Sequence, residues 1–287
     1  MIVLRLVGGL GNQLFQYCTG RAVATRLAAE LVLDTGWFQG PFLTDTRRVF
    51  GLQSFRIKAR LPTRRENAWL SLYSNPLLAR VPFPRPWRYI REAHYHFDNR
   101  IESLPDNVYL SGYWQSEKYF LSIRDSLLED LQPSQQAPDA WTAHLQTVTV
   151  AESVSMHIRR GDYVSRPTTA AYHGALPLSY YHDAARFVAS RVRNPVFFVF
   201  SDDPDWVTDN LRLEHPMHVV TPFSTDPVWE MLLMSKCRHS VVANSSFSWW
   251  GAWLKTHPGS VTVAPMRWFG DPDRNTADLT PTAWHRL

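Results

Sequence analysis

The chain contains only two cysteines, Cys18 and Cys237, which lie far apart among apolar neighbours. So few thiols exclude a disulfide-rich fold and give no sign of a cysteine-based metal site, and we expect both to be buried and free. Long hydrophobic runs are also missing, since no apolar stretch reaches the roughly eighteen residues that a membrane-spanning helix needs. The first residues, Met1 to Val7, lack the pattern of a signal peptide, and we expect a cytoplasmic protein.

A phosphate-binding loop ending in Lys-Ser/Thr is absent as well. A glycine-rich turn is nevertheless present at Gly8 to Gln13, between a predicted strand and a helix predicted over Leu14 to Ala29. A strand, turn and helix in this order present backbone N–H groups to phosphate. Leu14 replaces the third glycine of a dinucleotide-binding fingerprint. A nicotinamide-dependent oxidoreductase is therefore a weaker alternative, even though Asp34 ends the next strand where a ribose-binding acid is expected. The glycines could also simply allow close packing at the helix entry.

Acidic residues are scarce in one segment of the chain. From Arg47 to Arg100, 12 Lys+Arg stand against 3 Asp+Glu, whereas the whole chain has 30 against 26. Such a segment predicts an anionic partner, and we expect peripheral contact of residues 47–100 with a membrane or with a lipid-linked substrate. Solvated arginines around core aromatic residues are the alternative. Nucleic acid is not expected, because no RNA-binding signature is present.

The length of 287 residues suits two domains. The best linker is Gln132 to Trp141, which contains Pro133 and Pro138, and it predicts domains at 1–140 and 141–287. Beyond the linker, strands alternate regularly with helices, which predicts an α/β domain with a doubly wound parallel sheet. The strands are expected at 154–158, 196–200, 218–220, 240–243 and 261–264, and the helices at 180–192, 206–211, 228–234 and from about 244 to 254.

Two arginines follow the strand at 154–158. Because ligands of α/β sheets bind outside the carboxyl ends of strands, Arg159 and Arg160 emerge where an anionic ligand is expected. A guanidinium binds phosphate oxygens in a fork and keeps its charge at working pH. Gly161 permits the tight backbone that follows. A surface ion pair between Arg160 and Asp162 is the alternative.

Two later strand ends carry polar groups. Asp202 or Asp203 can accept hydrogen bonds from a guanine edge or a ribose, but Asp203 and Asp205 also fit a metal-binding pattern, and Asp203 could simply cap the next helix. Ser245 and Ser246 stand at a helix start, where free N–H groups suit a diphosphate. Ordinary serine capping is the alternative at this second position.

An aromatic cluster follows a strand of the first half. Tyr113, Trp114 and Gln115 combine ring faces with an amide, which suits the C–H faces and hydroxyls of a sugar ring. Most such clusters belong to a protein core, so packing is the competing interpretation.

Five stretches together resemble the motif set of the bacterial α-1,2-fucosyltransferases, family 11 of the glycosyltransferases. They occur in the expected order at Gly8 to Tyr17, Gly112 to Gln115, His157 to Tyr163, Phe200 to Asp203 and Asn244 to Ala252. The resemblance implies an α/β GT-B fold with two Rossmann-like domains facing a central cleft, an acceptor-side domain at 1–140 and a GDP-fucose-binding domain at 141–287. It also implies GDP-fucose as donor, inversion at the anomeric carbon, a galactose-terminated glycan as acceptor, and no required metal or other cofactor.

The resemblance also assigns roles to residues. Arg159 would stabilise the charge that builds on the β-phosphate, and the matching asparagine of related enzymes makes Asn12 a catalytic candidate. The donor-binding candidates are Gly9, Gly11, His157, Arg160, Asp202, Asp203, Asn244, Ser245, Ser246 and Phe247. The acceptor-binding candidates are Tyr113, Trp114 and Gln115.

The general base is the open question. Asp162 is the nearest matching acid, but an arginine beside it lowers the pKa of the carboxyl and makes it a weak base, so a structural role or a dissociative route with little base assistance is also open. Two further function classes remain alternatives to a fucosyltransferase. One is a metal-dependent transferase using Asp203 and Asp205, and the other is a sugar-binding module without catalysis.

Overall fold

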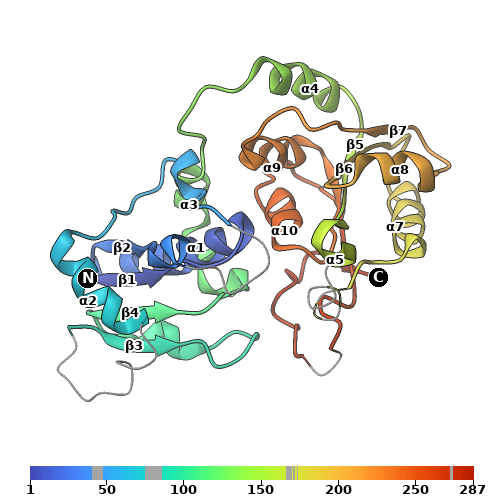
Figure 1. The fold of residues 1–287 in the computed structure, drawn as a ribbon. Helices are drawn as coiled ribbons and strands as arrows, with labels where there is room; N and C mark the ends of the chain where they lie inside the picture. The colour runs from blue at the N-terminus through green and yellow to red at the C-terminus, as the bar shows by residue number, and fades with distance from the viewer. Residues whose placement is uncertain (41–47, 75–85, 166–169, 171, 173, 272–273) are drawn as a thin grey trace. The chain divides into compact units, whose positions relative to one another are not determined.

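A computed structural model describes residues 1–40, 48–74, 86–165, 170, 172, 174–271 and 274–287, apart from the side chains of 72–74, 162 and 165. The chain divides into two compact units, drawn in Figure 1. The first unit contains Met1–Gln135 and Ala277–Leu279, and the second contains Gln136–Thr276 and Thr280–Leu287. Each unit is built around its own sheet, and each sheet pairs its strands in parallel.

The first unit has a four-stranded sheet in the order β2-β1-β4-β3. Its strands are β1 (Ile2–Arg5), β2 (Leu31–Asp34), β3 (Arg88–Arg91) and β4 (Val108–Ser111). Its α-helices are α1 (Leu10–Arg26), α2 (Arg64–Ser74) and α3 (Arg124–Asp130). Short 3-10 helices cover η1 (Gly36–Gln39), η2 (Leu52–Ser54), η4 (Asn99–Ser103), η5 (Glu117–Tyr119) and η6 (Leu121–Ile123).

This sheet lies between α1 and α2. On the α1 side, Gly20 sits so close to Leu4 and Leu31 that an added Cβ would lie 3.0 and 3.1 Å from their methyl groups. On the α2 side, Leu70 packs into a buried cluster with residues of the strands, namely Val3, Val32, Tyr109 and, just before β3, Trp87. Opposite faces of the strands therefore pack on different helices, as alternation along a strand requires.

The second unit has a six-stranded sheet in the order β10-β9-β8-β5-β6-β7. Its strands are β5 (Ser153–Ile158), β6 (Val196–Ser201), β7 (Met217–Val219), β8 (His239–Val241), β9 (Thr262–Ala264) and β10 (His285–Arg286). Its helices are α4 (Asp139–Thr149), α5 (Gly161–Ser165), α7 (Leu178–Ala189), α8 (Pro204–Asn210), α9 (Pro227–Lys236) and α10 (Ser246–Trp253).

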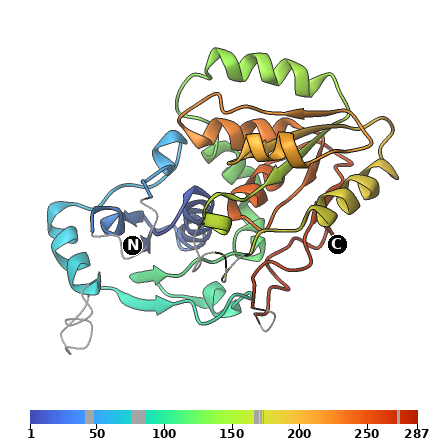
Figure 2. The same ribbon diagram turned by 45° about the vertical axis from the view of Figure 1, so that its right-hand side comes forward.

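Helices cover both faces of the second sheet, with α7 and α8 on one side of β5 and β6 and α9 and α10 on the other (Figure 1). The α7 side forms a buried cluster that includes Met156, Tyr181, Val199 and Val207. Figure 2 shows α4 alongside α9, where the rings of Trp141 and Trp229 meet at 5.7 Å. A parallel sheet covered on both faces is the doubly wound arrangement, which confirms the predicted α/β class.

Several predicted boundaries need correction. Helix α1 begins at Leu10 and not at Leu14, because the turn is completed by Gly8 at a φ of +80° and Gly9 then caps the helix. Gly161, predicted to permit a tight backbone, is the first residue of the short helix α5, which was not predicted. The edge strand β3 was not predicted, because its basic sequence is apolar only at Ile90 and it is held by pairing with β4.

The two cysteines are buried and free, as predicted. Among the helices of the described residues, none combines the length and hydropathy that crossing a membrane requires.

A buried carboxylate ties three segments of the first unit together. Asp130, at the end of α3, has no exposed surface and accepts the Tyr17 hydroxyl at 2.7 Å and the Arg21 Nε at 2.9 Å. The Lys58 Nζ lies 3.4 Å from its other oxygen, and the Lys58 N–H donates to the Tyr17 hydroxyl at 2.9 Å. A buried charge needs such partners, because its desolvation is otherwise uncompensated.

We expect Asp130→Ala to lower the free energy of unfolding of the first unit by about 3–5 kcal/mol, because it leaves the Arg21 guanidinium and the Tyr17 hydroxyl without their acceptor. Glu129→Ala is the control, since this neighbour in α3 is exposed and should change stability by no more than about 0.5 kcal/mol. Urea unfolding followed by tryptophan fluorescence measures both. Equal stability of the two variants would contradict this account of Asp130.

Candidate functional site

The strand order of the second sheet predicts where a ligand binds. From β5 the chain first adds β6 on one side and later adds β8 on the other, so β5 and β8 flank a topological switch point. Ligands of open α/β sheets bind outside the carboxyl ends of the strands at such a point. Arg159, Asp202 and Ala243 to Ser245 follow the ends of β5, β6 and β8, and the fold thus brings three of the predicted motifs to one edge.

Arg159 is held at this edge by Asp202. The Arg159 guanidinium lies 2.8 Å from the Asp202 carboxylate, and the two side chains are 24% and 25% exposed. The same carboxylate accepts the backbone N–H of Arg160 at 2.9 Å. Gly161 leaves the room for this arrangement, since a Cβ there would lie 2.5 Å from an Asp202 oxygen. The end of β5 is thus fastened to the end of β6 while Arg159 keeps an accessible surface.

Arg160 has a different environment from Arg159. Its guanidinium lies 3.5 Å above the Trp206 ring, and its Nε contacts the Asp203 carboxylate at 3.2 Å. Asp203 also caps α8 by accepting the Trp206 N–H at 3.3 Å. Arg160 is therefore part of the α8 entry, where it pairs with Asp203. The ion pair predicted as its alternative, with Asp162, falls on a side chain outside the described part of the structure.

The backbone of Asp162, the candidate general base, belongs to α5, and its side chain lies outside the described part of the structure.

The metal alternative depends on acidic residues that would lie close together. Among the described residues, no three His, Cys, Asp or Glu side chains gather as a metal ion would require. Asp205 is exposed on α8.

His157 is the buried polar residue of β5. It is 4% exposed, and burial lowers the pKa of its imidazole to about 4, so the ring is neutral at pH 7. Its Nδ1 has no hydrogen-bond partner within the described chain, and its ring lies 5.7 Å from that of Phe247. A buried nitrogen without a partner is uncommon in proteins and is suited to a ligand group.

The entry of α10 supplies backbone N–H groups. Ser245 occupies the N-cap position, but its hydroxyl makes no capping bond, so the ordinary capping alternative is not what the structure shows. Ser246 and Phe247 then form the first turn and are half-buried. Asn244 fixes the preceding loop by donating to the carbonyls of Gly174 at 2.9 Å and Trp268 at 3.3 Å. A helix start of this kind favours an anion.

Sequence reasoning missed Glu230, in the first turn of α9. Helix α9 leads into β8, so its first turn lies at the same edge of the sheet as Arg159 and Asp202. Burial and, less strongly, the negative charge of Asp202 raise the pKa of the Glu230 carboxyl to about 7, whereas the charge of Arg159 acts in the opposite sense. The sequence offered little signal, because an acidic residue in a first helical turn is ordinary.

The glycine-rich motif of the first unit lies at that sheet's own switch point, between β1 and β4. Gly8, with its positive φ, also leaves room for Asn12, whose side-chain nitrogen would lie 2.8 Å from a Cβ there. Gly9 has open space around it, and Gly11 is buried in the first turn of α1. Asn12 accepts the Gln115 amide at 2.7 Å, so two predicted site residues meet directly.

Two buried glutamines of the same motif hold the loops in place. Gln13 donates to the carbonyls of Gly8 at 3.0 Å and Val49 at 2.9 Å and accepts the Gly51 N–H at 2.9 Å. Gln16 accepts the Val7 N–H and donates to the Gly112 carbonyl, both at 3.0 Å. These residues were not predicted to have a role. In the structure, Gln13 joins the loop after β1 to the segment of Val49 and Gly51, and Gln16 joins the loops after β1 and β4.

The aromatic motif after β4 divides between surface and core. Tyr113 is 38% exposed, whereas Trp114 has no exposed surface and holds a φ of +55°. The stacking face predicted for Trp114 is therefore absent, because the indole is packed inside. Glu92 fixes the loop by accepting the N–H groups of Tyr113 at 2.7 Å and Trp114 at 2.9 Å.

The basic segment is partly neutralised by the protein itself. Arg60 pairs with Glu30 and Glu66, and Arg100 pairs with Asp98. The exposed cations of the segment include Arg64, Arg65, Arg88 and Arg91, whereas Arg47, Arg80 and Arg85 lie outside the described residues. Contact of this segment with an anionic lipid surface stays a prediction.

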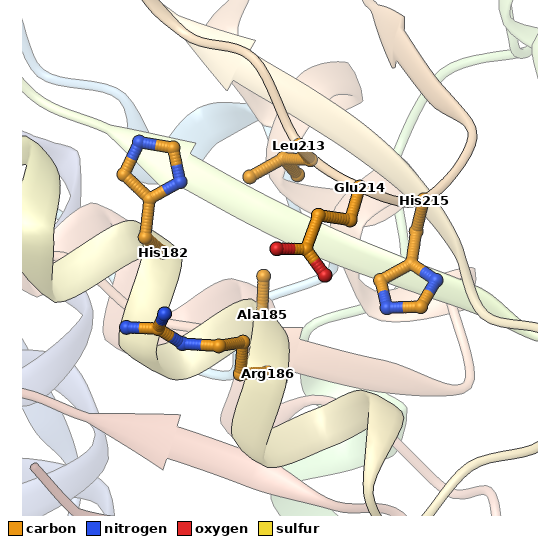
Figure 3. A pocket seen from close by; sticks show the side chains of 6 residues that line it. All are labelled: His182, Ala185, Arg186, Leu213, Glu214 and His215. Carbon is orange, nitrogen blue, oxygen red and sulfur yellow. The ribbon is translucent and has the colours of Figure 1, made fainter.

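A separate small pocket lies between α7 and the segment before β7 (Figure 3). It is lined by His182, Ala185, Arg186, Leu213, Glu214 and His215. Figure 3 shows the Glu214 carboxylate between the two imidazoles. No residue of the predicted site lines this pocket, and Arg186 is paired with Asp183.

Comparison with known proteins defines the class and the family. The family model described as glycosyl transferase family 11 matches residues 89–286. Two relatives from Escherichia coli are 34% identical: the O-antigen biosynthesis glycosyltransferase WbnK, over 98% of this chain and 99% of the relative, and an alpha-1,2-colitosyltransferase, over 100% and 99%. The chain is therefore a glycosyltransferase. It belongs to glycosyl transferase family 11, as the motifs predicted.

Solved structures agree on the fold. Arabidopsis thaliana FUT1 in complex with GDP aligns with a TM-score of 0.52 at 11% identity, covering 91% of this chain and 69% of that protein. Fucosyltransferase NodZ from Bradyrhizobium aligns with a TM-score of 0.50 at 12% identity, covering 88% and 93%. At such low identity the likeness concerns the fold, and it confirms the predicted GT-B class.

We expect Gly161→Ala to disturb the site without unfolding the protein. The new Cβ would displace the Asp202 carboxylate, which costs less than about 1 kcal/mol of stability but weakens two charge-assisted contacts, so the rate of glycosyl transfer should fall about tenfold to a hundredfold. Gly40→Ala is the control, because its nearest neighbour is a carbonyl oxygen 3.9 Å away. Urea unfolding and initial rates measure the two effects. Normal activity in a folded Gly161→Ala protein would show that the position of Asp202 is not needed.

Proposed function

We propose that this chain is an inverting galactoside α-1,2-fucosyltransferase that moves L-fucose from GDP-β-L-fucose to the 2-hydroxyl of a terminal β-galactose. The single observation that carries the proposal is Arg159, oriented by Asp202 at the switch point of a family 11 glycosyltransferase. The second unit would bind the donor and the first unit the acceptor. Galactoside 2-alpha-L-fucosyltransferase SEC1 of Bos taurus, 26% identical over 59% of this chain and 48% of its own length, supports the linkage and the donor.

In the proposed reaction, the acceptor oxygen attacks the anomeric carbon from the face opposite the diphosphate. The bond from that carbon to the β-phosphate oxygen breaks, its electron pair leaves with GDP, and the acceptor hydroxyl loses its proton. Negative charge on the leaving phosphate grows as the bond breaks, and a fixed guanidinium stabilises that charge most in the transition state. Arg159 would supply this stabilisation together with the N–H groups at the start of α10.

The remaining candidates would orient the donor. The Nδ1 of His157 and the carboxylates of Asp202 and Asp203 would bind the nucleoside. Ser245, Ser246 and Phe247 would bind the diphosphate, and Asn12, fixed by Gln115, would serve the transfer from the first unit. Asp162 stays a candidate base beside a dissociative route in which the proton passes to solvent.

A second donor has a specific observation in its favour. The Escherichia coli relative at 34% identity is named an alpha-1,2-colitosyltransferase, and colitose is the 3-deoxy counterpart of L-fucose. Both sugars would be presented on the same nucleoside diphosphate, so the phosphate contacts described above serve either donor.

We expect Arg159→Ala to lower kcat by about 10²–10³, because a donor aimed at a developing anion contributes that much. Arg191→Ala is the matched control, since that guanidinium stacks on Phe187 at 3.6 Å on the surface of the same unit. The assay is GDP release from GDP-fucose with lactose as acceptor in EDTA. Activity that vanishes in EDTA and returns with Mg²⁺ would move the chemistry to the acidic residues, and a fully active Arg159→Ala protein would refute the role of Arg159.

The linkage gives an independent test. Methyl β-galactoside should accept fucose from GDP-fucose, whereas its 2-deoxy analogue should yield no product, because the reacting oxygen is missing. Product analysis by NMR identifies the substituted carbon. Transfer to the 2-deoxy analogue would exclude the α-1,2 linkage, and equal or faster transfer of colitose from GDP-colitose would favour the second donor.

A further inference from the structure

The two strands at the switch point of the second unit stop pairing before β5 ends. The hydrogen-bonded pairing of β5 with β8 reaches Met156 and Val241. On its other side, β5 stays paired with β6 as far as Ile158 and Ser201. Other contacts must therefore hold Arg159, which follows β5, in position relative to the loop that leads from β8 into α10.

The hydroxyl of Tyr163 makes one such contact. Tyr163 belongs to α5 and is buried, and its hydroxyl donates to the backbone carbonyl of Asn244 at 3.1 Å. Asn244 is also buried and directly precedes Ser245, the N-cap of α10. The hydroxyl thus ties the segment after β5 to the loop that positions the N–H groups at the start of α10.

The ring of the same tyrosine contacts Arg159. The guanidinium carbon lies over the Tyr163 ring, 5.6 Å from its centroid, which is within the distance at which an aromatic face attracts a cation. The Asp202 carboxylate holds the same guanidinium at 2.8 Å. A ring in this position restricts the orientations open to the guanidinium, and a group that is already oriented needs little reorganisation when charge develops beside it.

One buried side chain therefore contacts both groups that would bind the diphosphate. We propose that Tyr163 is a positioning residue of the donor site, which holds Arg159 and the start of α10 at the separation that one diphosphate requires. This inference rests on the proposed donor class. Tyr163 acts through the guanidinium and through the loop before α10, so it is not a catalytic residue.

Two substitutions separate the hydroxyl from the ring. Tyr163→Phe removes only the hydroxyl, and we expect GDP binding and kcat/KM for GDP-fucose to fall about fivefold, because the loop before α10 loses one hydrogen bond. Tyr163→Leu also removes the ring, and kcat/KM should fall about a further fivefold. Calorimetry with GDP measures binding, and GDP release from GDP-fucose with lactose as acceptor measures the rate.

The same pair of variants in an Arg159→Ala protein tests whether the ring acts through the guanidinium. If it does, Tyr163→Phe and Tyr163→Leu should have equal kcat/KM there, because the group that the ring orients is missing. The loss of GDP binding caused by Tyr163→Phe should persist, since the hydroxyl acts on the loop before α10. A ring that only packs the interior would keep its full effect without Arg159.

Tyr180→Phe is the matched control. The Tyr180 hydroxyl is also buried, and it donates at 2.7 Å to the carbonyl of Val242, two residues before Asn244. The variant thus loses a comparable hydrogen bond to the same segment without altering the contact with Arg159 or with Asn244. We expect Tyr163→Phe and Tyr180→Phe to lose similar stability in urea unfolding, whereas Tyr180→Phe keeps wild-type GDP binding and kcat/KM.

The outcomes separate this inference from the proposed function. Normal GDP binding and kcat/KM in folded Tyr163→Phe overturn the role of the hydroxyl and leave the proposed donor intact, and this variant keeps the buried ring if Tyr163→Leu does not fold. An equal loss of activity in Tyr180→Phe, or an undiminished effect of the ring without Arg159, also overturns positioning. A wild type that neither binds GDP nor turns over GDP-fucose rejects the proposed donor and, with it, the inference.

Discussion

The ion pair between Arg159 and Asp202 is the contact on which the candidate site at the carboxyl ends of β5 and β6 depends. It exists because Ile158 pairs with Ser201 in the sheet, so that β5 and β6 end side by side and the next residues meet. The Asp202 carboxylate then holds both the Arg159 guanidinium and the Arg160 N–H, and it fits only because residue 161 has no side chain. Because Asp202 already holds the Arg159 guanidinium in place, the guanidinium needs little reorganisation when negative charge develops beside it.

Much of the fold was predictable because most strands of the second unit are short, mainly apolar runs followed by polar residues; β10, which is only His285–Arg286, was not predicted. That pattern predicts both the parallel sheet and the edge of the sheet at which the candidate functional residues lie. It fails for β3, whose arginines are exposed at an edge, because pairing with β4 and not local sequence makes that strand. It also misplaces the start of α1, since nothing local shows that Gly11 and Asn12 already follow a helical path after the turn at Gly8.

A residue of the candidate site was predictable when it belongs to a recognisable sequence motif. It was not predictable when burial in the fold determines its exposure or its pKa. Glu230 is an ordinary helix-start acid in sequence, and its burial became visible only once the fold was known. Trp114 shows the reverse case, because this aromatic residue belongs to a motif typical of sugar binding but is buried in the loop that Glu92 fixes. Gln13 and Gln16 show that one motif can hold both structural and functional residues.

In the proposed function, residues other than Arg159 would discriminate between donor sugars. In that function, the guanidinium, the α10 entry and His157 would bind groups that any GDP-linked sugar shares, so they would set the reaction type and not the sugar. L-Fucose differs from colitose by one hydroxyl, and a site that hydrogen-bonds a hydroxyl rejects the deoxy analogue strongly, because its own polar group is then left without a partner. A site without such a partner tolerates both sugars. Members of one family can therefore differ in donor through a single polar contact to the 3-hydroxyl.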